Sequence, residues 1–114
     1  MIKDLDLAKY TRVFLVCGYT DLRMGQTGLV NLVQLKLGLN PFDKSAVFLF
    51  CGRKASTIKA LCFEGDGFVL ASKKLLQGRY QWPRNQAEAR ILTKEQFIQL
   101  MSGFSIESTI GDRP

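Results

Sequence analysis

The chain has 114 residues, of which 46% are apolar and 23% charged, with a formal net charge of +6 and no histidine. This length and composition exclude a disordered chain and a protein with long membrane spans, and they suffice for one domain with its own core. The absence of histidine excludes imidazole-based catalytic triads and zinc sites with His ligands.

We expect a single compact domain over residues 1–114, with residues 1–11 and 105–114 loosely ordered, as chain termini commonly are. Nothing in the sequence has the pattern of a signal peptide or a membrane span, so we expect a cytoplasmic protein without a membrane partner. Cys17, Cys51 and Cys62 each lie in an apolar run without a CxxC pair. This favours buried free thiols, with a metal site formed by all three as the alternative.

The first half of the chain predicts two similar buried strands with a helix between them. VFLVC at 13–17 and AVFLF at 46–50 are short β-branched and aromatic runs, and the strings VFLVCG and VFLFCG nearly repeat. Between them, a wide apolar stripe over 26–37 predicts a helix that Thr20 or Asp21 can cap.

A β-hairpin is predicted at the centre of the chain. The apolar runs TIKALCF and FVLASKKL flank a Gly-Asp pair, which suits the backbone of a tight turn. This turn pairs Phe63 with Phe68 and Lys59 with Ser72, so both faces of the hairpin are apolar near the turn and become polar toward its open end.

The last third of the chain predicts one more strand and a second helix. RYQWP at 79–83 is typical of an edge strand that ends at a proline, and RNQAEAR at 84–90 of a loop or short helix. A capping box of Thr93 and Gln96 begins a helix near 94–102. Together the elements predict an α+β fold: one compact domain with a mainly antiparallel sheet of four to five strands, a central β-hairpin and two main helices.

Two acids at the hairpin turn, Glu64 and Asp66, raise the question of catalysis. Such a pair could hold a divalent metal or share acid and base roles, but a metal-dependent site for phosphoryl transfer needs further converging carboxylates. Acids between glycines also suit a solvated turn. We therefore expect no catalytic residue, no metal site and no cofactor.

The basic residues are concentrated in the later part of the chain. If the hairpin forms as predicted, its open end lies roughly 15 Å from the acidic turn on extended strands. We expect Arg53, Lys54, Lys59, Lys73, Lys74 and Arg79 to form a basic rim there, able to contact nucleic acid through its phosphates. Tyr80 and Trp82 could stack on bases beside this rim, or could simply cover the edge of the core.

The order of the motifs is similar to one known family. YTDLRMGQTGL, NPF, TIKALCFEGDGF and KKLLQGRYQWP follow one another over roughly residues 12 to 104. In this order they resemble the TnpB family, the accessory proteins encoded by the second open reading frame of insertion sequence 66 elements. The positions that match the family motifs include Thr20, Asp21, Arg23, Gly25, Gly65, Asp66 and Gly67.

The resemblance implies a non-catalytic accessory protein of DNA transposition in bacteria, which works beside a separate transposase. DNA and this transposase are then the expected partners, and a homo-oligomer is possible. The alternative is an assembly module that binds the transposase or itself without contacting DNA, in which the basic residues only increase solubility.

Overall fold

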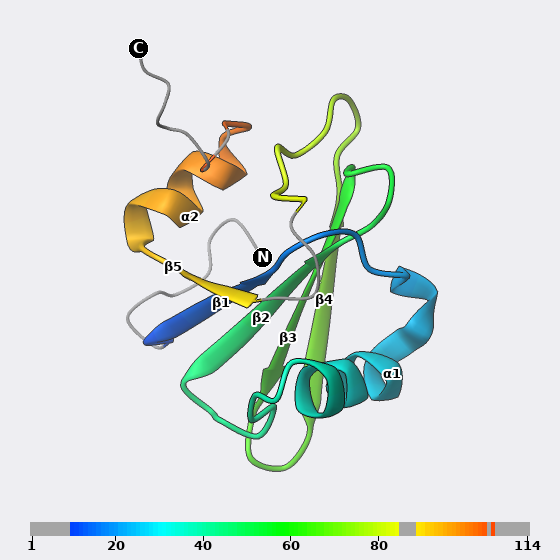
Figure 1. Cartoon of the computed structure of the whole chain (residues 1–114), viewed down its shortest axis with the longest axis vertical. Helices are drawn as coiled ribbons and strands as arrows, with labels where there is room; N and C mark the ends of the chain where they lie inside the picture. The colour runs from blue at the N-terminus through cyan, green and yellow to red at the C-terminus, as the bar shows by residue number, and fades with distance from the viewer. Residues whose placement is uncertain (1–9, 85–88, 105, 107–114) are drawn as a thin grey trace.

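The computed structural model describes residues 10–84, 89–104 and 106 (Figure 1). The expectation of loose order at 1–11 and 105–114 lies outside these residues, apart from 10, 11 and 106. Within the described part of the chain, no helix is long and apolar enough to cross a membrane.

A five-stranded mixed sheet forms the centre of the fold. Its strands are β1 (Arg12–Val16), β2 (Ala46–Cys51), β3 (Thr57–Phe63), β4 (Phe68–Lys74) and β5 (Ala89–Leu92). Their order across the sheet is β4-β3-β2-β1-β5, and every neighbouring pair is antiparallel except β1 and β2. The predicted α+β fold with a mainly antiparallel sheet is therefore confirmed.

The two nearly repeated strings lie side by side as the parallel pair. Val13 is opposite Val47, and Leu15 is opposite Leu49. Every residue of β2 is buried, as expected for a central strand covered on both faces. A parallel pair requires a crossover connection, and the helical segment between the two strands provides it.

The predicted helix over 26–37 is divided into two helical pieces, and a further short turn precedes it. A 3₁₀ turn, η1 (Leu22–Met24), leads into α1 (Gly25–Asn31) and then into a π-helical segment, η2 (Leu32–Lys36). Asp21 caps the first turn, because its side chain accepts a hydrogen bond from the Arg23 backbone N–H.

The two main helices cover opposite faces of the sheet (Figure 1). Leu29 of α1 and Val33 of η2 pack with Phe48 and Leu61 on one face. On the other face, α2 (Lys94–Met101) buries Phe97 and Leu100. The predicted capping box of Thr93 and Gln96 begins α2, so this helix starts where its sequence signal lies.

The predicted edge strand at 79–83 is wrong. The Tyr80 N–H donates to the Ala55 carbonyl at 2.7 Å, and the Gly18 N–H donates to the Pro83 carbonyl at 2.8 Å. These bonds carry the segment across the ends of β1 and β2 instead of along a strand. The fifth strand is β5, whose first two residues, Ala89 and Arg90, fall in the segment that the sequence assigned to a loop or short helix. Residues 85–88 of that segment lie outside the described part.

The central hairpin has the predicted register. Phe63 is opposite Phe68, and Lys59 is opposite Ser72. The Glu64 N–H donates to the Gly67 carbonyl at 2.8 Å, which closes a turn with Gly65 and Asp66 at its centre. Gly65 has a φ of 99°, a value that glycine adopts at no steric cost.

Substitution of Gly65 tests the role of this turn in stability. Gly65→Ala should lower the free energy of unfolding by about 1–2 kcal/mol, because an L-residue is strained at this φ. An added Cβ would meet only the flexible Lys44 side chain, at 3.5 Å, so the cost arises from the backbone.

The matched control is Gly67→Ala, because the φ of Gly67 is not positive and a Cβ there meets nothing within 4 Å. It should change the stability by less than about 0.5 kcal/mol in urea unfolding. Equal losses in the two variants would contradict this account of the turn.

Candidate nucleic-acid interface

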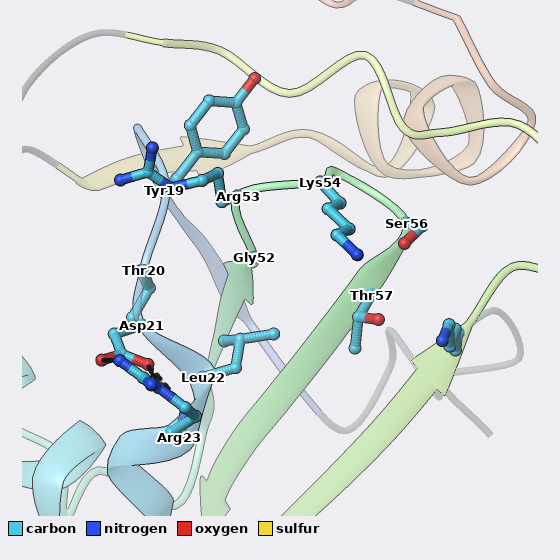
Figure 2. A pocket seen from close by; sticks show the side chains of 11 residues that line it. Tyr19, Thr20, Asp21, Leu22, Arg23, Gly52, Arg53, Lys54, Ser56 and Thr57 are labelled. Carbon is cyan, nitrogen blue, oxygen red and sulfur yellow. Dashed lines mark hydrogen bonds and ion pairs between the residues drawn. The ribbon is translucent and has the colours of Figure 1, made fainter.

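A hollow of about 770 Å³ lies at the edge of the sheet where β1 and β2 end (Figure 2). Because the two strands are parallel, their carboxyl ends meet at this edge together with the segments that follow them. The residues that line the hollow come from these segments, from the start of β3 and from the end of β4: Tyr19, Thr20, Asp21, Leu22, Arg23, Gly52, Arg53, Lys54, Ser56, Thr57 and Lys74.

Hydrogen bonds connect the two segments that follow β1 and β2. The Thr20 N–H donates to the Cys51 carbonyl at 2.8 Å, and the Lys59 ammonium donates to the Leu22 carbonyl at 3.0 Å. A Cβ built on Gly52 would lie 3.1 Å from a Leu22 methyl group, so the glycine permits close packing between the segments. These contacts hold the two segments together beside the hollow.

The turn between β2 and β3 holds two cations at the mouth of the hollow. The Ala55 N–H donates to the Gly52 carbonyl at 2.9 Å, and Ala55 has a φ of 60°, which is uncommon for a residue with a Cβ. The Ala55 side chain is buried, whereas Arg53 and Lys54 are exposed. The conformation of the turn therefore directs both cations toward solvent.

An ion pair lies on the opposite side of the hollow. Arg23 donates two hydrogen bonds to the Asp21 carboxylate, each at 2.9 Å (Figure 2). This hydrogen bonding lowers the pKa of the Asp21 carboxyl to about 2, so the carboxylate stays ionised at neutral pH. Asp21 thereby offsets the charge of Arg23.

Three other cations of the hollow have no such partner. Among the described residues, no carboxylate lies within ion-pair distance of Arg53, Lys54 or Lys74. The hollow is therefore positive, with exposed charges that are hydrated in the free protein. An anion bound there would gain Coulomb attraction without first displacing an acidic side chain.

Only three of the six residues of the predicted basic rim line the hollow. Arg53, Lys54 and Lys74 line the hollow, whereas Lys59 is half-buried and donates to the Leu22 carbonyl beside it. Lys73 and Arg79 do not line the hollow. Lys73 lies one residue before Lys74 on β4, so its side chain projects from the other face of the sheet.

Tyr80 and Trp82, predicted as stacking residues, lie in the core. Their exposed fractions are 3% and 4%, and the Trp82 indole N–H donates to the Val16 carbonyl at 2.9 Å. Burial leaves neither ring free to meet a base. The alternative stated for them, that they cover the edge of the core, agrees with their positions.

The residues that match the family motifs separate into two groups. Thr20, Asp21 and Arg23 belong to the hollow, and Gly25, with a φ of 74°, begins α1 beside it. Gly65, Asp66 and Gly67 lie in the hairpin turn at the other end of β3 and β4.

The acids of the turn remain apart from other metal-binding side chains. Glu64 and Asp66 are both exposed. Within residues 10–84, 89–104 and 106, no group of three or more His, Cys, Asp or Glu side chains could hold a metal ion.

Sequence reasoning missed five of the lining residues: Leu22, Gly52, Ser56, Thr57 and Tyr19. Tyr19 is the aromatic residue among the five. It is 42% exposed and directly follows Gly18, where the chain leaves β1. The near-repeat of VFLVCG and VFLFCG contained the signal: had these strings been paired as parallel strands, Tyr19 and Arg53 would have been expected at one edge.

Comparisons with known proteins give a match to one family model and two similar proteins. The family model described as IS66 Orf2 like protein matches residues 11–110. The uncharacterized protein y4hO of Sinorhizobium fredii is 38% identical over 92 residues, which cover 81% of this chain and 79% of that protein. A second uncharacterized protein of the same strain, y4jC, is 27% identical over 92 residues, or 81% of this chain and 78% of its own length. No solved structure gives a significant match.

The three cysteines are buried thiols, as predicted, and no disulfide joins any two of them. Cys51 ends β2 and directly precedes Gly52, which lines the hollow, and its carbonyl accepts the bond from Thr20. Burial raises the pKa of the Cys51 thiol from 9.0 to about 12, because the interior disfavours the charged thiolate.

This raised pKa predicts a pH dependence of stability. In the unfolded chain the thiol ionises near pH 9.0 and in the folded protein only near 12, so unfolding releases a proton between these values. The contribution of the thiol is complete below pH 9.0 and falls as the pH rises above it. Cys51→Ala should therefore be less stable than the wild type by a smaller margin at pH 10 than at pH 8. The difference in the free energy of unfolding between the two proteins, measured in urea, should shrink by roughly 1 kcal/mol from pH 8 to pH 10. Equal margins at both pH values would contradict the prediction.

Proposed function

The chain belongs to the IS66 Orf2-like family and so has an accessory role in transposition, and on that premise we propose that it binds DNA through the hollow. In this proposal it acts as a non-catalytic helper beside a separate transposase. One observation carries the proposal: Arg53 and Lys54 from the turn after β2, and Lys74 from the end of β4, converge on one concave surface without acidic partners among the described residues.

The physical basis is counterion release. DNA carries a dense row of phosphates with condensed cations, and each protein cation that replaces one of these ions adds favourable entropy. Unpaired cations are ready for this exchange, whereas Arg23 would first have to leave Asp21. Arg53, Lys54 and Lys74 therefore supply most of the attraction in the proposal.

The distribution of charge along the hairpin supports an approach of DNA to the open end of the hairpin, where the hollow lies. Glu64 and Asp66 lie at the turn, and Lys74 lies at the far end of β4. The strands between them span about 20 Å, which exceeds the Debye length of about 8 Å at physiological salt. A DNA molecule would therefore be attracted to the hollow with little repulsion from the acids.

A second candidate function, an assembly module, has its own observation. Phe42 is 48% exposed and packs edge-on against Phe63, with ring centroids 5.3 Å apart, while Phe68 lies 5.4 Å from it. An exposed aromatic group of this kind can bind a protein partner such as the transposase or a second copy of the chain.

Capture of the element's transposase separates the two functions. If assembly is the function, capture should survive charge reversal at Lys73 and Lys74 and should be lost in Phe42→Ser. If DNA binding is the function, the charge reversal should abolish DNA binding, and Phe42→Ser should leave DNA binding unchanged.

The DNA-binding proposal predicts a specific salt dependence. Replacing Arg53 and Lys54 together by Gln should weaken DNA binding and reduce the slope of log affinity against log salt by about 1.8, or about 0.9 for each lost phosphate contact. Fluorescence anisotropy with a labelled duplex, at several salt concentrations, measures both quantities.

The matched control replaces Lys36 and Lys44 by Gln. It changes the net charge equally, but Lys36 ends η2 and Lys44 lies beside Gly65, so neither residue lines the hollow. The control should retain nearly the wild-type slope. Equal losses in both double variants, or an absence of DNA binding even at low salt, would refute the proposal.

A further inference from the structure

The hollow places one exposed aromatic ring among its cations. Tyr19 lines the hollow and is 42% exposed, although burial of such a ring is normally favourable. The backbone on both sides of it is held: the Gly18 N–H donates to the Pro83 carbonyl and the Thr20 N–H to the Cys51 carbonyl, each at 2.8 Å. The end of the sheet therefore fixes where the ring lies.

The walls around Tyr19 present the groups that the parts of a nucleotide require. Arg53 and Lys54 supply cations for phosphate, and the half-buried Ser56 and Thr57 supply hydroxyl groups for a sugar or a base edge. Figure 2 shows the ring and Arg53 on one side of the mouth, with Lys54 and Ser56 across from them. At about 770 Å³, the hollow can admit a nucleotide.

The concave position of the ring favours one form of DNA. In a duplex, each base is paired and stacked between its neighbours, so a ring inside a hollow reaches a base face only if the base leaves the helix. In a single strand the base faces are free, and proteins bind them by combining aromatic stacking with a positive groove.

We propose that the hollow binds single-stranded DNA, with an unpaired base stacked on Tyr19 and the neighbouring phosphates on Arg53, Lys54 and Lys74. This inference rests on the proposed function, because it names the form of DNA that the same site takes. The protein would then hold the unpaired strands that cutting and joining of DNA expose.

Three labelled nucleic acids test the inference by fluorescence anisotropy. They are a thymine strand of about twelve nucleotides, an abasic strand with the same number of phosphates, and a duplex of equal length. The wild type should bind the thymine strand about tenfold more tightly than the abasic strand, because only the former can stack. Tyr19→Leu should abolish this preference and change duplex binding by less than about twofold.

Two variants serve as controls. Tyr19→Phe keeps the ring and should keep the preference for thymine. Phe104→Leu removes a ring that is 64% exposed but does not line the hollow, and it should change nothing. Thermal unfolding of each variant confirms that it is folded, which is expected because both side chains are exposed.

The outcomes distinguish this inference from the proposed function. If Tyr19→Leu weakens the binding of the thymine strand and of the abasic strand equally, or leaves the preference for the thymine strand intact, the stacking role of Tyr19 is wrong. If binding depends on Arg53 and Lys54 but not on the bases, single-strand recognition fails while DNA binding through the hollow stands. If the wild type binds none of the three nucleic acids, both proposals fail.

Discussion

The parallel pairing of β1 and β2 is the constraint on which the rest of the structure depends. It places two nearly identical apolar strings side by side at the centre of the sheet, where both faces are covered. It also requires a crossover, so α1 and η2 cover one face and leave the other to α2. Because parallel strands end at the same edge, the segments that begin at Tyr19 and Arg53 meet there and form the hollow.

Because the central strands are buried, charged side chains lie mainly at the ends of the sheet. Charged side chains cannot lie along β2, since all of its residues are buried and an unpaired charge there would be strongly destabilising. Arg53, Lys54 and Lys74 therefore lie at the open end of the hairpin, and Glu64 and Asp66 lie at its turn. The same packing that builds the core separates these three cations from the two acids of the turn.

The aromatic residues show that the sequence around a ring does not predict whether that ring is buried or exposed. Trp82 and Tyr80 follow basic residues in the sequence, yet the segment that carries them crosses the ends of β1 and β2 and buries both rings. Tyr19 lies in a motif without a basic neighbour on either side, yet it stays exposed beside Arg53. Whether an aromatic ring is buried depends on which surface its segment crosses, and a distant strand supplies that surface.

Local patterns alone determined the hairpin register, the start of α2 and the burial of the three cysteines. Each depends on turn chemistry, capping or apolar runs within a few residues of the chain. Only the tertiary structure decided that β5 replaces the expected strand at 79–83 and that Thr20, Asp21 and Arg23 meet Arg53, Lys54 and Lys74. The reason is that strand order and direction bring together residues far apart in the chain, and near-neighbour patterns contain no information on either.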